Sequence, residues 1–255
     1  MADFEIIEPS TTSRQFQLNR RVALADTDPS GRLRLDACAR YLQDVAAFDA
    51  IDADISQIGN WVLRENNISI ASFPTYGQAV NSKTYLTGSG RAWVERTSVI
   101  SDVSSGATLI SAQAIWVLTN LTTGAPASVP ERLYEIYGPL ALKRRISIRN
   151  TRPQKAPDHA TKINWQIRYS DQDILSHLNN ATYLEVVEEV AYRQDIKLAP
   201  QQHVVCSVLF KESTSYDDQS EVLFTASNQG SVANISVYFV KNGLARTTLD
   251  LKILK

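Results

Sequence analysis

Cysteine, methionine and histidine are scarce in this chain, whose 255 residues include two Cys, one Met and three His. Cys38 and Cys206 cannot form a disulfide framework, and no Cys/His cluster has the spacing of zinc ligands. We therefore expect neither a bound metal nor another cofactor. No run of residues approaches the ~18 consecutive apolar positions that a membrane span requires.

An excess of charge of either sign is also lacking. The chain has 26 Lys and Arg against 27 Asp and Glu, a formal net charge of −1, so nothing draws the whole chain towards nucleic acid. Residues 1–5, MADFE, show neither the basic start nor the apolar block of a secretory signal. These absences predict a cytoplasmic enzyme or binding protein with a packed core and without a nucleic-acid partner.

An internal repeat with an offset of 145 residues organises the chain. Residues 22–31 read VALADTDPSG and residues 167–176 read IRYSDQDILS, so two Asp of one copy correspond to two of the other. An apolar stripe at helical spacing follows each copy. Its members are Leu35, Ala39, Leu42 and Ala46 in the first half, and Tyr183, Val186, Val187, Val190 and Ala191 in the second. Gly and Pro are absent from 33–54 and 179–199, so both helices can be long.

Strand patterns follow each predicted helix, and turn signals such as Asn242-Gly243 separate them. A lone long helix beside a bent antiparallel sheet buries its apolar stripe on the concave face of that sheet. The sequence therefore predicts an α+β fold with two such units. The expected strands are 61–70, 79–88, 93–103 and 109–118 in the first half, and 203–210, 221–227, 233–240 and 245–253 in the second.

The segment 122–160 holds five prolines and reads as an extended linker between the units, with one short helix near 131–137. It also carries basic residues with no acidic residue among them. This cluster either remains solvated or docks an acidic partner. Its members are Lys143, Arg144, Arg145, Arg149, Arg152 and Lys155.

The chemistry concentrates in residues 169–183, YSDQDILSHLNNATY. The carboxylate of Asp173 and the imidazole of His177 lie four residues apart on a strand-to-helix connection, and Asn179 and Asn180 follow at the expected start of the helix. A helix N-terminus presents unpaired N–H groups and positive partial charge, which can stabilise an oxyanion. The Asp and His can orient and deprotonate a water. Together these groups suit hydrolysis of an activated acyl group.

A structural role for the same residues remains open at this point. An Asp before a helix is usually a cap, and the two Asn can cap as well. The first copy of the repeat keeps both Asp but has Arg32 in place of His177, and Arg34 and Leu35 in place of the two Asn. This asymmetry indicates one chemical half and one half with a structural or ligand-holding role.

The stretch resembles the signature of the acyl-ACP thioesterase family, whose members are double hotdog proteins. Asp171-x-Asp173-x-x-x-His177-x-Asn179-Asn180-x-x-Tyr183 is similar to the family pattern Asp-x-Asp-x-Asn-x-His-Val-Asn-Asn-x-x-Tyr. Further landmarks are similar at similar spacing: Trp61-Val62-Leu63-Arg64, Phe73-Pro74-Thr75-Tyr76-Gly77, Trp116-Val117 and Val129-Pro130-Glu131. The resemblance implies a tandem double hotdog in which unit 1–121 holds the acyl chain, 122–160 is the linker and unit 161–255 is catalytic.

Two positions depart from the family pattern. The catalytic Asn expected two residues before the His falls on Leu175, which cannot replace the hydrogen bonds of an amide. A later family Glu falls on Ser213 in a gapless alignment, with Glu212 beside it. Glu188 and Glu189 are alternative carboxylates on the second helix, and we expect both to be solvated surface charges.

By this resemblance the chain hydrolyses fatty acyl-ACP to free fatty acid in fatty acid biosynthesis, with acyl carrier protein as its partner. Asp173 orients or deprotonates the water, or attacks directly to give an anhydride. His177 assists proton transfer. The backbone N–H near Asn180, in the Asn179-Asn180 pair at the helix start, polarises the carbonyl of the thioester. Alternatives are an acyl-CoA thioesterase and an acyl-binding protein without hydrolysis. The fused units are expected as a monomeric pseudo-dimer or a homodimer.

Overall fold

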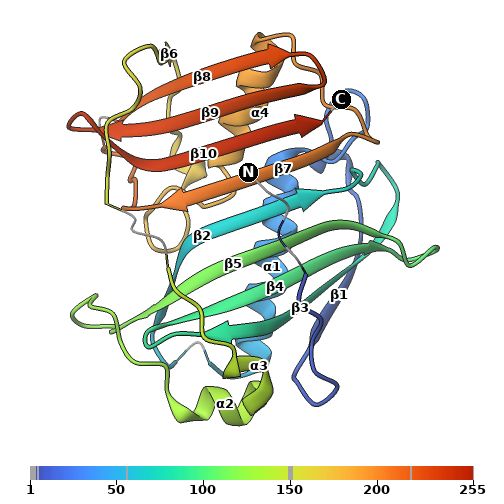
Figure 1. Ribbon diagram of the computed structural model, residues 1–255, viewed down its shortest axis with the longest axis vertical. Coiled ribbons are helices and arrows are strands. Elements are labelled where there is room, and N and C mark those ends of the chain that lie inside the picture. The colour runs from blue at the N-terminus through green and yellow to red at the C-terminus, as the bar shows by residue number, and fades with distance from the viewer. Residues whose placement is uncertain (1–3, 5, 56, 149–151, 219, 255) are drawn as a thin grey trace.

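One antiparallel sheet of ten strands runs through the computed structural model, which describes residues 4, 6–55, 57–148, 152–218 and 220–254. The first half of the chain supplies one side of the sheet and the second half the other (Figure 1). In spatial order the strands are β1 (Phe16–Arg21), β3 (Ala79–Ser89), β4 (Trp93–Asp102), β5 (Thr108–Thr119), β2 (Asn60–Ile70), β7 (His203–Phe210), β10 (Leu244–Leu254), β9 (Val232–Lys241), β8 (Glu221–Gln229) and β6 (Thr161–Ile163).

The order of the strands has internal two-fold symmetry. Reading outward from the centre, β2, β5, β4, β3 and β1 on one side correspond to β7, β10, β9, β8 and β6 on the other. The halves join where β2 pairs with β7, from Glu65 opposite Leu209 to Ile70 opposite Val204. The repeat in the sequence is thus a repeat in structure, and backbone hydrogen bonds make the two half-sheets continuous.

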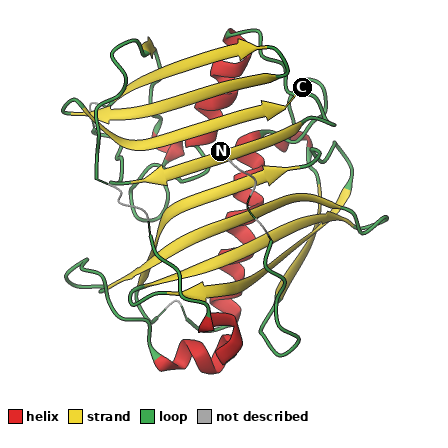
Figure 2. Ribbon diagram, in the orientation of Figure 1, coloured by secondary structure: helices red, strands yellow, loops and turns green. Residues whose placement is uncertain are grey.

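The two long helices lie on the same face of the sheet (Figure 2). They are α1 (Leu35–Asp52) in the first half and α4 (Tyr183–Arg193) in the second. Their predicted apolar stripes are confirmed, because every stripe residue is buried in the core. Burial of such side chains contributes roughly 1.5–3 kcal/mol each for the larger members. The α+β class predicted from the sequence is confirmed.

Both helices end in the same way, at an Asp in the left-handed region. Asp54 has φ 51° and Asp195 has φ 53°. The next residue is apolar and buried, and its N–H donates back into the last turn: Ile55 to Ala50 at 3.0 Å, and Ile196 to the α4 carbonyl of residue 191 at 2.9 Å. This is the Schellman arrangement. It stops α4 after 11 residues, so the second helix is shorter than the absence of Gly and Pro suggested.

The segment after β5 contributes to the first half of the fold. It forms α2 (Glu131–Tyr137), at the predicted place, and α3 (Pro139–Lys143). Leu133, Tyr137 and Leu142 from these helices are buried against Ile55 and Leu86 in a small second core. Beyond α3 the chain passes in front of the strands, on the face opposite α1 (Figure 1).

The eight predicted strands are confirmed with ends within two residues of those observed. No helix in the described part of the chain is long and apolar enough to cross a membrane. Among the same residues no three His, Cys, Asp or Glu side chains gather as metal ligands would.

Candidate active site

The loop before α4 is built around the carboxylate of Asp173. Its Oδ1 accepts hydrogen bonds from the N–H groups of Leu175 at 2.8 Å and His177 at 3.4 Å. The Asp173 N–H donates to the His177 carbonyl at 2.8 Å, and the Ser176 N–H donates to the Asp173 carbonyl at 3.0 Å. Asp173 therefore holds its own turn, as Asp side chains often do. No described residue donates to its other oxygen, Oδ2.

The loop before α1 repeats this hydrogen-bond pattern. Asp28 Oδ1 accepts from the N–H groups of Ser30 at 2.9 Å and Arg32 at 3.0 Å. The Asp28 N–H donates to the Arg32 carbonyl at 2.9 Å, and the Gly31 N–H donates to the Asp28 carbonyl at 2.9 Å. The duplicated Asp is thus a structural element in both halves. The copies differ at Oδ2, which in Asp28 accepts from Arg32 Nε at 3.2 Å and in Asp173 accepts from no described residue.

The predicted site residues separate into two groups. Asp173 is half-buried, and with Leu175 and Asn180 it lines a cavity of about 230 Å³. His177 is exposed, and its side chain is not part of this lining. The structure therefore brings Asp173 and Asn180 together at a cavity and leaves the imidazole outside it.

The two Asn have different positions. Asn179 Oδ1 accepts from the Ala181 N–H at 2.9 Å, and the Asn179 carbonyl accepts from the Thr182 N–H at 3.0 Å, so Asn179 caps a turn. The regular helix begins only at Tyr183, so the expectation that α4 begins at the Asn pair is wrong by one turn. Asn180 lies within this turn, and neither its N–H nor its amide is hydrogen-bonded to a described residue.

A second cavity, of about 30 Å³, adjoins the first. Gln43, Arg96, Trp116 and Asn180 line both, as does Ala46. Together the cavities follow α1 along the concave face of the first half-sheet. The larger one is otherwise mostly apolar; its further lining residues are Ala47, Ala50, Ile55, Trp61, Leu86, Val94 and Leu133. The small side chains of Ala46, Ala47 and Ala50 on α1 leave this space.

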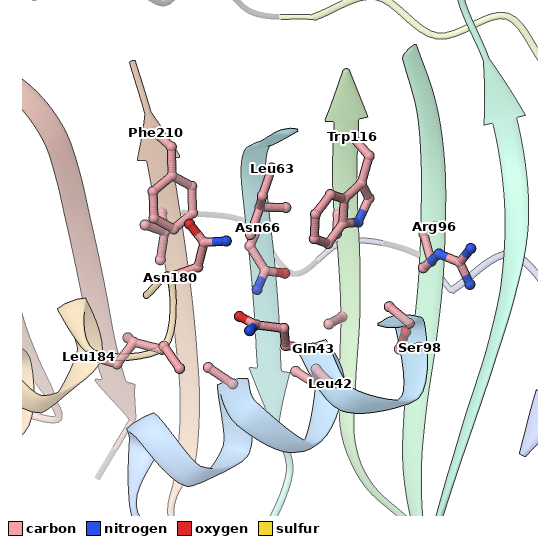
Figure 3. Close-up of a pocket in the computed structure, with 16 residues that line it drawn as sticks. Leu42, Gln43, Leu63, Asn66, Arg96, Ser98, Trp116, Asn180, Leu184 and Phe210 are labelled. Carbon is pink, nitrogen blue, oxygen red and sulfur yellow. The ribbon is translucent and has the colours of Figure 1, made fainter. Parts of the chain in front are cut away.

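Three amide side chains meet at the smaller cavity. Gln43 projects from α1, Asn66 from β2, and Asn180 from the turn before α4 (Figure 3). The Oδ1 of Asn66 and the indole Nε1 of Trp116 are fully buried, and neither has a hydrogen-bond partner among the described residues. Sequence reasoning missed Gln43 and Asn66, although an Asn facing the core from the middle of a buried strand is unusual enough to have been a signal.

Arg96 belongs to a buried ionic cluster beside the cavities. Its Nη1 donates to Asp49 Oδ2 at 2.6 Å, and its Nη2 donates to the Tyr137 hydroxyl at 3.1 Å. Asp49 also accepts from the Tyr137 hydroxyl at 2.6 Å and from Arg14 Nε at 2.9 Å. Burial raises the pKa of Tyr137 to about 12, so this phenol stays protonated and donates. The cluster fixes the Arg96 side chain in the cavity wall.

In the first half the equivalent site is closed by Glu188 of α4. Glu188 forms an ion pair with Arg32, which is 2% exposed, and its Oε2 accepts from the Leu35 N–H, the first of α1, at 2.7 Å. Burial raises the pKa of Glu188 above its ordinary value, against the opposing charge of Arg32. The prediction that Glu188 is a solvated surface charge is wrong; Glu189, paired with Arg193 at the surface, fits it.

The offset of 145 residues relates the two sites group by group. Leu35 corresponds to Asn180, and Glu188 corresponds to Gln43. In the first half the Glu188 carboxylate accepts a hydrogen bond from the Leu35 N–H at the start of α1. In the second half the corresponding side chain is the neutral Gln43, and no acceptor in the described part of the chain is bonded to the Asn180 N–H. A hollow of about 760 Å³ adjoins the first-half site, but Asp28, Arg32 and Glu188 in its lining are bonded to one another or to backbone.

The two candidate positions for the later family Glu lie outside the site. Glu212 is paired with Arg246 and Ser213 is exposed, and neither lines the two cavities. In the basic cluster of the linker, Arg144 pairs with Glu95 and its Nε donates to the Thr87 carbonyl at 3.0 Å. Arg149 lies outside the described residues.

Comparison with known proteins extends over most of the chain. The profile of the acyl-ACP thioesterase N-terminal domain matches residues 13–137, and that of the C-terminal domain matches residues 154–245. The chloroplastic palmitoyl-acyl carrier protein thioesterase of Arabidopsis thaliana is 27% identical over 143 residues, which are 51% of this chain and 33% of that protein. The chain thus spans only about a third of the length of that curated relative.

Two solved structures share the fold. A 12:0-ACP thioesterase from Umbellularia californica superposes with a TM-score of 0.74 at 18% identity, covering 94% of this chain and 93% of that one. An acyl-ACP thioesterase from Bacteroides thetaiotaomicron superposes with a TM-score of 0.70 at 17% identity, covering 94% and 97%.

Proposed function

The chain belongs to the acyl-ACP thioesterase family and has a double hotdog fold, and from this premise we propose that it hydrolyses fatty acyl-ACP to free fatty acid and acyl carrier protein. The observation that carries the proposal is the placement of Asp173. Its turn is duplicated in both halves, but of the two carboxylates Asp173 alone lines a largely apolar cavity, beside the Asn180 N–H, which is bonded to none of the described residues.

The reacting groups follow from this placement. Asp173 keeps Oδ1 for its turn and uses Oδ2 to accept the proton of the attacking water. The Asn180 N–H, at the start of the turn into α4, donates to the oxyanion that forms at the thioester carbonyl. Asn179 orders that turn as its cap. We assign His177 a lesser part, because its imidazole lies outside the cavity lining.

We assign the acyl chain to the larger cavity. The space extends along α1 past Ala46 and Ala50 and ends near Ile55 and Leu133, so it is apolar away from Asp173. An apolar slot with polar groups at one end suits a fatty acyl thioester. This assignment gives acyl holding to the unit 1–121 and catalysis to the unit 161–255, joined by 122–160.

Carrier recognition is proposed for exposed basic residues at the end of α3 and just after it. Lys143 and Arg145 are exposed, whereas Arg144 is held by Glu95. An acidic carrier surface would approach Lys143 and Arg145 with favourable electrostatic steering.

The decisive experiment is thiol release from acyl-ACP and acyl-CoA of several chain lengths by the parental protein and Asp173→Asn. Asn preserves the Oδ1 that holds the turn, so the fold should survive while turnover falls by about 10²–10⁴-fold. Asp28→Asn is the matched control: it alters the same turn in the first half, away from the cavity, and should leave turnover near the parental rate.

Three outcomes contradict parts of the proposal. Parental turnover by Asp173→Asn refutes the catalytic assignment. Faster release from acyl-CoA at equal chain length favours an acyl-CoA thioesterase. Tight binding of acyl thioesters by the parental protein without any thiol release identifies an acyl-binding protein.

A further inference from the structure

The smaller cavity combines three properties that together specify its occupant. Its volume of about 30 Å³ is large enough to hold a water molecule. Its wall contains a buried acceptor, Asn66 Oδ1, and a buried donor, Trp116 Nε1, to which no residue in the described part of the chain is hydrogen-bonded. An unsatisfied buried polar group costs about 1–3 kcal/mol, so two in one wall indicate that a polar molecule satisfies both.

We propose that the amides of Gln43, Asn66 and Asn180 bind the water that attacks the thioester. The unpaired Oδ1 of Asn66 requires a donor, which a water has and a thioester lacks. The amides of Gln43 and Asn180 are turned towards the same space and are not bonded to described residues (Figure 3). They supply the further contacts that a buried water needs, usually two to four in all.

The position of this water fits the reaction of the proposed function, on which the inference depends. Gln43 and Asn180 also line the larger cavity, which contains Asp173 and the apolar slot. A thioester at the junction has the water on one side and the Asp173 carboxylate within the same site. The water oxygen bonds to the carbonyl carbon, Asp173 takes the proton, the carbon–sulfur bond breaks, and the proton passes to the leaving thiolate.

The cluster also explains how the chain tolerates Leu175. An amide at that position would be able to hold a water, and Leu cannot. Gln43 and Asn66 come from the first half of the chain, so the water-binding amides are contributed across the seam between the halves. In the first-half site Glu188 is the residue that corresponds to Gln43. Glu188 forms an ion pair with Arg32 and accepts a hydrogen bond from the Leu35 N–H.

The test compares Asn66→Leu with Asn67→Leu. Asn67 is the next residue of β2 and bonds Glu65 and Ser207 on the opposite face, so the control makes the same chemical change away from the cavity. Asn66→Leu should lower kcat by about 10²–10³-fold, with unchanged KM and unchanged affinity for a non-hydrolysable thioether analogue. Asn67→Leu should keep the parental kcat. Adding Leu175→Asn to Asn66→Leu should restore part of the loss.

A high-resolution crystal structure of the parental protein gives a second readout that is independent of activity. A water bonded to Asn66 Oδ1 is expected, and a dry cavity overturns the inference. Parental turnover by Asn66→Leu also overturns it, while leaving the proposed function intact. Absence of turnover in the parental protein refutes the proposed function, and with it the catalytic role of the water.

Discussion

Removal of the charge of Asp49 tests the buried ionic cluster beside the cavities. Asp49 is fully buried and, among the described residues, is the only carboxylate paired with Arg96, which is itself 6% exposed. Asp49→Asn keeps the shape of the side chain but leaves the Arg96 cation buried without a counter-charge. Breaking a buried pair in this way costs about 3–5 kcal/mol. For a chain of this size, at about 2–4 °C per kcal/mol, Tm should fall by about 6–20 °C.

The cause of this loss can be isolated by a second substitution. If the stranded cation is responsible, then Asp49→Leu combined with Arg96→Met should recover part of the free energy of unfolding, because apolar replacements of both partners are often neutral. Recovery stays incomplete because the Tyr137 hydroxyl and Arg14 lose the acceptor that Asp49 supplied. Asp52→Asn is the matched control, since Asp52 pairs with Arg14 at the surface and such pairs contribute about 0–1 kcal/mol. Urea unfolding followed by circular dichroism measures all three variants.

The reasoning is refuted if Asp49→Asn loses less than about 1 kcal/mol, or if the double variant is no more stable than the single one. A functional readout accompanies the stability. Because Arg96 lines both cavities, Asp49→Asn should also weaken acyl binding at temperatures where the protein remains folded.

Two further predictions concern the paired loops and the closed first-half site. Ser176 has φ 57° where the first copy has Gly31 at φ 82°, so Ser176→Gly should stabilise the fold and Gly31→Ser should destabilise it, each by about 1 kcal/mol in urea unfolding; destabilisation by Ser176→Gly would contradict this. Burial raises the pKa of Glu188 above 4.5, so the folded state binds the proton more tightly than the unfolded one. The free energy of unfolding of the parental protein should therefore fall, relative to Glu188→Gln, as pH rises from about 4.5 through the raised pKa, and a difference independent of pH would contradict this.

Most of the fold was readable from local patterns. The strand alternation, the Asn-Gly turn and the helical stripes are short-range signals, and the eight predicted strands and α2 lie where they were expected, whereas no range was predicted for β1 and β6. The length of α4 was not readable, because an Asp rather than a Gly takes the left-handed position that ends it. The packing of α2 and α3 over the end of the first half depends on long-range contacts that periodicity does not contain.

The candidate site was readable in part. The repeat located Asp173, and the structure adds that its carboxylate holds the same turn as Asp28. Gln43 and Asn66 were missed because they approach Asn180 from other elements, and no spacing within one stretch reveals such an encounter. A signal for Gln43 existed: extending the offset of 145 residues into the helices pairs it with Glu188, and that exchange of a carboxylate for an amide separates the closed site from the open one.

The joining of both halves in one polypeptide has a consequence for how this architecture can evolve. In a symmetric dimer of identical subunits, a mutation that seals one active centre seals the other as well. Here Glu188 fills one site, where it pairs with Arg32 of the other half, while the neutral Gln43 lines the open cavity of the site that we propose to be catalytic. Covalent linkage thus allows one gene to encode two related sites that have diverged, one closed by an ion pair and one open to a ligand.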